Sequence, residues 1–166
     1  MSVLINDKID NLLKTTSRSF YPTLKYLPKK VRGQIGLLYL LARVADTIAD
    51  SKSGETEELL RLLRDYNKVA QGKSNDLPDF SKLAEIQENP HEAELLLNVS
   101  DVVDGLMVYS EEDRQRMLEC LDIIVGGQIL DLERFGPAKE GGNLSSLSNN
   151  LELDDYTFRV AGCVGV

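Results

Sequence analysis

An all-α fold is predicted for this 166-residue chain by three observations. Apolar residues recur at helical spacing along most of its length, no segment shows sustained strand-like alternation, and proline, glycine and N-cap residues separate the periodic runs. The length corresponds to about one domain. We therefore expect residues 1–166 to form a single all-α domain around one core.

The first helices are expected on either side of a proline. Residues 3–20 follow the helical period, and we expect Tyr21-Pro22 to close that helix, because the residue before a proline avoids the helical region. Pro28 suits the first turn of a second helix, which runs to about Asp50. Thr56 is expected to cap a third helix over residues 59–70.

The middle of the chain predicts two further helices after a connector. A polar segment with one short helix near residues 81–87 leads to a fourth helix over 92–109. Ser110 and Asp113 resemble a capping box, which would start a long helix that ends near Phe135.

Two glycines are expected to interrupt the long helix, and a last helix follows it. Gly126-Gly127 indicate a kink, the close approach of a ligand or backbone, or packing against small residues. Residues 137–150 resemble a linker, after which Asp154 or Asp155 would cap a helix that continues to residue 166. Because this helix shows no stop signal, we expect the chain to be part of a longer protein.

A polar stripe runs along the second expected helix. Between residues 36 and 50, Tyr39, Arg43, Asp46 and Asp50 stand among apolar residues and one threonine. At about 100° per residue, an α-helix places these four on a stripe roughly 60° wide. A helix that is apolar nearly all round is normally buried, so we expect the stripe to face an internal cavity.

The two aspartates of this stripe favour a metal site. In a structural alternative, Arg43 simply pairs with Asp46, or the stripe is a buried salt bridge in a helical bundle. However, Asp46 and Asp50 carry like charges four residues apart on a helix, so each destabilises the other. They also lie near the helix C-terminus, where the macrodipole disfavours negative charge. Mg²⁺ would compensate this cost, because it prefers oxygen ligands and is often held by one or two carboxylates plus phosphate.

Composition excludes several other function classes. A net charge of −8 without a basic stripe argues against nucleic-acid binding. No signal peptide or membrane-spanning segment is predicted, so we expect a cytoplasmic protein, with peripheral membrane contact left open. His91 is the one histidine, which argues against a histidine zinc site or a Ser-His-Asp triad. Cys120 and Cys163 are interpreted as reduced core residues.

Three segments together carry a family resemblance. They are Thr-Ser-Arg-Ser-Phe at 16–20, Tyr-Leu-Leu-Ala-Arg-Val-Ala-Asp-Thr-Ile-Ala-Asp at 39–50, and Tyr-Thr-Phe-Arg-Val-Ala-Gly-Cys-Val-Gly at 156–165. In order and spacing they resemble the squalene/phytoene synthase family. The resemblance implies an isoprenoid-synthase helical fold that joins two prenyl diphosphates head to head, with Mg²⁺, through a cyclopropylcarbinyl diphosphate intermediate.

The resemblance also implies roles for the polar stripe. Asp46 and Asp50 match the family's first aspartate cluster and would hold Mg²⁺ against the diphosphate. Arg43 would grip diphosphate oxygens. Tyr39 would line the cavity beside a carbocation. Tyr156 matches the tyrosine of the family's Tyr-Cys-x-x-Val-Ala-Gly pattern, although a threonine replaces the cysteine here.

Other matched positions are expected to contact substrate. Ser17, Arg18 and Ser19 match a substrate-facing segment, and Phe20 would border the prenyl tail, although a polar helix C-terminus is the structural alternative. Two further polar residues are expected on the cavity wall. They are Gln128 and Asp131.

One element of the family pattern is absent. The second aspartate-rich cluster would lie beyond residue 166, and a complete site is expected to hold two or three Mg²⁺ ions. We therefore expect the N-terminal part of a synthase domain, inactive alone and prone to form a homodimer through exposed apolar surface. NADPH would be needed only for a squalene-type product. The alternative is a non-catalytic helical relative that acts in assembly or interaction.

Overall fold

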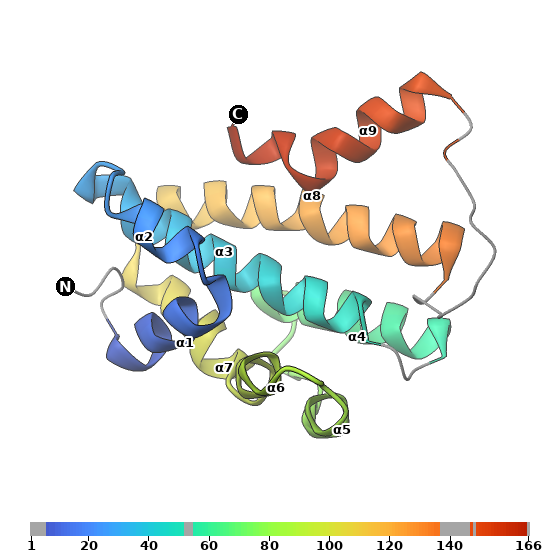
Figure 1. Cartoon of the computed structure of the whole chain (residues 1–166), viewed down its shortest axis with the longest axis horizontal. Helices are drawn as coiled ribbons and strands as arrows, with labels where there is room; N and C mark the ends of the chain where they lie inside the picture. The colour runs from blue at the N-terminus through green and yellow to red at the C-terminus, as the bar shows by residue number, and fades with distance from the viewer. Residues whose placement is uncertain (1–5, 52–54, 137–146, 148, 166) are drawn as a thin grey trace.

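The computed structural model describes residues 6–51, 55–136, 147 and 149–165, and every regular element in these ranges is helical. Figure 1 shows the arrangement of these helices. The prediction of an all-α fold is therefore confirmed for the described part of the chain. None of the helices described is long and apolar enough to cross a membrane.

The described part of the chain consists of helices of different lengths. In chain order they are α1 (Asp7–Ser17), α2 (Phe20–Leu24), α3 (Lys29–Ala49), α4 (Thr56–Ala70), α5 (Ser81–Glu85), α6 (Pro90–Leu97), α7 (Val99–Asp104), the 3₁₀ helix η1 (Gly105–Val108), α8 (Glu111–Phe135), α9 (Asn150–Val160) and the 3₁₀ helix η2 (Gly162–Gly165).

Helix α3 is the centre of the fold. It packs against α8 and α4 on one side and against α1, α6 and α7 on the other, while α9 lies on the outer side of α8 (Figure 1). Leu40, Leu41 and Val44 of α3 are fully buried in the core. The phenol of Tyr66 on α4 is also fully buried and donates a hydrogen bond to the Leu41 carbonyl at 2.9 Å. This packing fixes the rotation of α3 and hence the direction of its polar stripe.

Several predicted elements are confirmed. The structure contains the second helix as α3, the third as α4, the short helix of the connector as α5 and the long helix as α8. Ser110 caps α8 as predicted, because its Oγ accepts a hydrogen bond from the Asp113 amide at 3.2 Å. The same hydroxyl donates to the Asp113 carboxylate at 3.0 Å, so the acid at this position engages the cap side chain.

The first predicted helix is wrong in its end point. Helix α1 stops at Ser17 because Arg18 takes a positive φ of 44°, which a residue with a Cβ adopts only at a cost. A new helix, α2, starts at Phe20, and Pro22 lies in its first turn, where its missing amide hydrogen is not needed. The predicted start near residue 3 lies outside the described residues.

Two other predicted helices are divided in the structure. The segment 92–109 breaks at Asn98, whose backbone leaves the helical region and whose side-chain amide donates to the Glu94 carbonyl at 2.7 Å. The final helix is capped by Asn149, not by an aspartate, and ends at Val160, because Ala161 has an extended φ of −148°.

Smaller corrections concern two helix starts and the linker. Pro28 is the N-cap of α3 and does not belong to its first turn, and Glu55 precedes α4, of which Thr56 is the first residue. Most of the predicted linker, residues 137–146 and 148, lies outside the described residues, as does Val166.

The glycine pair does not interrupt α8. A Cβ added at Gly127 would lie 3.0 Å from the Arg159 Cβ, and one added at Gly126 would lie 3.4 Å from the Arg159 Nη1. Of the alternatives that the sequence left open, the structure shows close approach of a neighbouring helix, because α9 crosses α8 at these positions.

Candidate functional site

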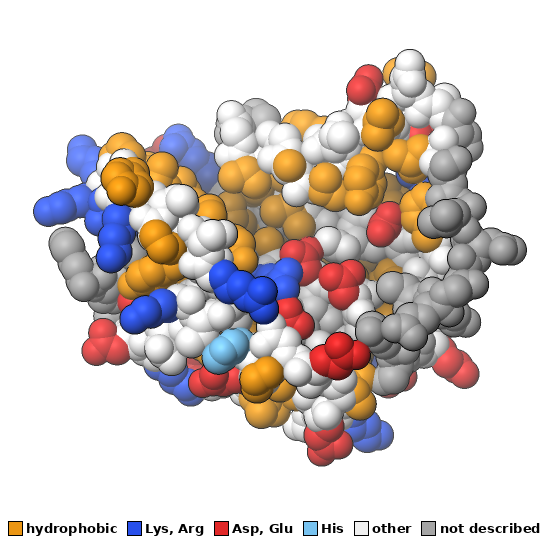
Figure 2. Space-filling model, in the orientation of Figure 1, with side chains coloured by type: hydrophobic (Ala, Val, Ile, Leu, Met, Phe, Trp, Pro, Cys, Tyr) orange, Lys and Arg blue, Asp and Glu red, His pale blue; other side chains and the backbone are white. Residues whose placement is uncertain are grey.

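A cavity of about 530 Å³ lies between α3, α8 and the C-terminal segment, which consists of α9 and η2. Its wall is mostly apolar, and Figure 2 shows a hollow of apolar side chains with acidic and basic groups gathered at one edge. The lining residues are Phe20, Ile35, Leu38, Tyr39, Ala42, Arg43, Asp46, Asp50, Ile124, Gln128, Tyr156, Val160 and Val164.

All four residues of the polar stripe lie on this wall. Tyr39, Arg43, Asp46 and Asp50 recur at spacings of four, three and four residues on α3, so they share the face that turns away from the core leucines. Ile35, Leu38 and Ala42 continue the same face as its apolar part. One helix therefore supplies both the polar end and much of the apolar wall of the cavity.

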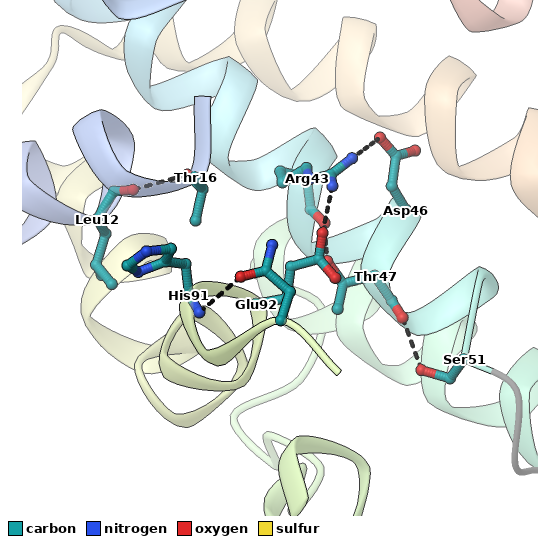
Figure 3. Close-up of polar contacts among 9 residues, drawn as sticks. Leu12, Thr16, Arg43, Asp46, Thr47, Ser51, His91 and Glu92 are labelled. Carbon is teal, nitrogen blue, oxygen red and sulfur yellow. Dashed lines mark hydrogen bonds and ion pairs between the residues drawn. The ribbon is translucent and has the colours of Figure 1, made fainter. Parts of the chain in front are cut away.

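Arg43 is held between two acids of different elements. Its guanidinium forms an ion pair with Glu92 at the start of α6 and lies 3.9 Å from the Asp46 carboxylate (Figure 3). Its Nε is buried and has no hydrogen-bond partner among the described residues. The ion pair with Glu92 fixes the orientation of the guanidinium at the edge of the cavity.

Asp46 is a partly buried acid whose lost hydration is only partly compensated by its neighbours. Its Oδ1 accepts a hydrogen bond of 2.5 Å from the Gln128 side chain of α8. Loss of hydration is the main cause that raises its pKa from 3.8 to about 6; the Arg43 charge lowers the pKa, Asp50 raises it, and the Gln128 hydrogen bond lowers it. Asp46 would therefore gain from a further positive charge.

Asp50 and Asp131 extend the acidic edge. Asp50 is exposed at the rim of the cavity, and its pKa is raised chiefly by lost hydration, with Arg43 opposing and the charges of Glu92 and Asp131 adding to the rise. Asp131 on α8 is not part of the cavity wall, and its own pKa is raised by desolvation. The charges of Glu92 and Asp131 thus make ionisation of Asp50 harder, and the charge of Asp50 does the same for Asp46.

Aromatic residues also line the cavity. The rings of Phe20 and Tyr39 are stacked with centroids 4.5 Å apart and an interplanar angle of 22°. Burial, as the largest cause, raises the pKa of the Tyr39 phenol, so its hydroxyl keeps its proton at neutral pH. Tyr156 of α9 reaches the same wall from the C-terminal side.

The segment before Phe20 lies outside the lining of this cavity. Ser17 is buried at the end of α1, and its Oγ has no hydrogen-bond partner in the described part of the chain. Arg18 and Ser19 are exposed in the turn that leads to α2. Of the four predicted residues in this segment, the structure brings Phe20 to the cavity wall.

Glu92 is the site residue that sequence reasoning missed. In the sequence it follows Pro90 and His91 and resembles an acid in the first turn of a helix, where such residues are common. Its partner Arg43 is 49 residues away, and the packing of α6 on α3 brings them together. No local pattern indicates such a pair, whereas the helical period of α3 does indicate the stripe.

The donor set at the cavity edge suits a hard divalent cation. Asp46 and Asp50 present carboxylate oxygens to one cavity, and the nearest positive charge, Arg43, is engaged by Glu92. Within the described ranges no three or more His, Cys, Asp and Glu side chains cluster as a complete metal site. Two carboxylates with the remaining ligands from water and phosphate is the pattern typical of Mg²⁺, so the residues present fit that ion.

Comparison with known proteins finds the same kind of protein along most of the chain. A family model described as squalene/phytoene synthase matches residues 13–166. The chain is similar to squalene synthase of Schizosaccharomyces pombe (24% identical over 155 residues), squalene synthase of Eremothecium gossypii (28% over 157) and squalene synthase ERG9 of Saccharomyces cerevisiae (27% over 161). Each alignment covers 93% of this chain and 32% of the relative. The chain therefore spans about a third of the length of the curated relatives it matches.

Proposed function

Because the chain belongs to the squalene/phytoene synthase family, we propose that its cavity binds a prenyl diphosphate with Mg²⁺ for head-to-head condensation to a squalene- or phytoene-type product. The observation that carries this proposal is the division of the cavity into two parts. Arg43, Asp46 and Asp50 lie together at one edge, and apolar side chains form most of the remaining wall. A prenyl diphosphate has the same division between an anionic head and an apolar tail.

The head group would bind at the polar edge. Arg43 lines the cavity and is already oriented by Glu92, so its guanidinium would bind diphosphate oxygens with little loss of side-chain freedom. Asp46 and Asp50 would hold Mg²⁺, which when bound neutralises diphosphate charge and favours its departure. Gln128 holds the Asp46 carboxylate by donating to its Oδ1, and the Oδ2, 3.9 Å from the Arg43 Nη1, would be the oxygen that binds the ion.

The prenyl tail would lie against the apolar wall. Ile35, Leu38 and Ile124 offer contacts without hydrogen-bonding groups, so water gains little by remaining there. The stacked rings of Phe20 and Tyr39 present π faces, which attract positive charge developing on an allylic carbon. Because the Tyr39 phenol stays protonated, its oxygen would not act as an anionic nucleophile toward that carbon.

Calorimetric titration of a non-hydrolysable prenyl diphosphate analogue tests this proposal. We expect binding by the wild-type chain in Mg²⁺ and a large loss of binding without Mg²⁺ or in an Asp46→Asn, Asp50→Asn double variant. An Asp76→Asn, Asp104→Asn double variant is the matched control, because it removes the same charge from exposed positions away from the cavity. Binding that is indifferent to Mg²⁺ and to the Asp46 and Asp50 substitutions would refute the assignment.

A further inference from the structure

The two cysteines of the chain meet in the folded structure. Cys120 lies on α8 and Cys163 lies on η2, 43 residues later, and their Sγ atoms are 3.7 Å apart. The Cys120 thiol donates to the Cys163 sulfur, and the Cys163 thiol donates to the Arg159 carbonyl at 3.5 Å. This order of donors leaves a lone pair of the Cys163 sulfur facing Cys120.

The thiol pair is reachable by a small reagent. Cys163 is 6% exposed and Cys120 is half-buried, yet both line a second cavity of about 420 Å³. Asp113, Arg116 and Glu119 border this cavity, and Ile35, Leu38 and Val164 separate it from the candidate site. A small solute that enters this cavity would therefore meet both thiols.

Cys163 is a main anchor of the C-terminal segment. No residue of α9 is buried, whereas Cys163 is the buried residue of η2. The same segment carries Tyr156, Val160 and Val164, which form the outer wall of the candidate site. A covalent bond between α8 and η2 would therefore fasten that wall to the body of the molecule.

We propose that Cys120 and Cys163 form a reversible disulfide that fastens α9 and η2 onto α8. The oxidant is a small-molecule disulfide such as oxidised glutathione. One cysteine thiolate attacks it, releases one glutathione thiolate and forms a mixed disulfide; the second cysteine attacks that bond, releases the second glutathione and closes the Cys120–Cys163 bond. Two S–H bonds are lost, one S–S bond is gained in the protein, and two electrons and two protons end on two glutathione thiols.

The environment of Cys120 sets the rate of this reaction. Burial, followed by the hydrogen bond and charge of Cys163, raises the pKa of Cys120 to about 12. Because the thiolate is the attacking species, we expect the bond to form slowly at neutral pH and faster as the pH rises. At equilibrium the folded chain nevertheless favours the disulfide, because it holds the two sulfurs close together before any bond forms.

Equilibration of the whole chain in defined glutathione buffers tests the proposal. The products are analysed by intact mass, by thiol labelling and on non-reducing gels, for native protein and for protein held in urea. We expect about tenfold or more intramolecular disulfide in the native chain than in the urea-unfolded chain at the same buffer ratio. Dithiothreitol should reverse it. Equal yields in the two states, or disulfides only between chains, would overturn the proposal.

A second readout tests the fastening itself. Oxidised wild type should unfold at a higher temperature than reduced wild type, and amide hydrogen exchange in α9 should slow by about tenfold or more. Cys120→Ser and Cys163→Ser should show neither change on oxidation, while keeping the helical signal of the reduced wild type. An intramolecular disulfide that leaves both the unfolding temperature and the amide exchange of α9 unchanged would show that the bond does not fasten α9 and η2 onto α8.

Discussion

Replacing Asp46 by Asn should stabilise the metal-free protein at pH 8 and leave its stability unchanged at low pH. The folded-state pKa of Asp46, about 6, is above the ordinary value of 3.8 that we assign to the unfolded chain. The folded state therefore binds the proton more tightly, and stability falls as the pH rises from about 4 through 6. The full cost of ionising Asp46 is present above about pH 7.

The magnitude follows from the same two values. A rise of about two in pKa corresponds to roughly 3 kcal/mol. The Asp46 side chain is 34% exposed, so solvent screening reduces this to about 1–2 kcal/mol. Asparagine keeps an oxygen for the Gln128 hydrogen bond and removes the charge, while Arg43 remains paired with Glu92.

Urea unfolding in EDTA, at pH 4 and at pH 8, measures this difference directly. We expect Asp46→Asn to exceed wild type by about 1–2 kcal/mol at pH 8 and to match it at pH 4. Asp104→Asn, at an exposed position, serves as the charge control. A variant that is no more stable than wild type at pH 8, or is equally stabilised at both pH values, would show that burial of Asp46 is not costly.

Two further predictions concern contacts around the cavity. Glu92→Gln should lower stability at pH 7.5 by about 1–2 kcal/mol in urea unfolding, because Arg43 loses a charge-assisted hydrogen bond; an unchanged midpoint would show that Glu92 does not hold the guanidinium. Gly126→Ala should raise stability by about 0.5–1 kcal/mol through helix propensity, since its Cβ meets the flexible end of Arg159. Gly127→Ala should instead lower it by about 1 kcal/mol, because its Cβ lies 3.0 Å from that residue's Cβ. Equal effects of the two alanines in thermal unfolding would contradict the packing described for α9.

The parts of the fold that the sequence predicts are those set by local periodicity. Helix α3 and its stripe follow from the spacing of Tyr39, Arg43, Asp46 and Asp50, because helical geometry alone places them on one face. Helix α8 follows from the Ser110 cap and the long periodic run after it.

The parts that the sequence does not predict depend on tertiary packing. The breaks at Arg18 and Asn98 occur inside runs of good helical periodicity, and the chain turns there so that neighbouring helices pack on α3. The ion pair between Arg43 and Glu92 joins residues 49 positions apart. Likewise, the contact between the two cysteines depends on how η2 meets α8, which no spacing along the chain reveals.

The most direct measurement is a crystal structure of the chain grown with Mn²⁺ in place of Mg²⁺ and with a prenyl diphosphate analogue, analysed by anomalous scattering. We expect an anomalous peak within coordination distance, about 2–2.5 Å, of carboxylate oxygens of Asp46 and Asp50, with diphosphate oxygens as further ligands and the prenyl tail against Ile35 and Leu38. An analogue bound elsewhere, or bound in the cavity with no metal at these two aspartates, would contradict the proposed site.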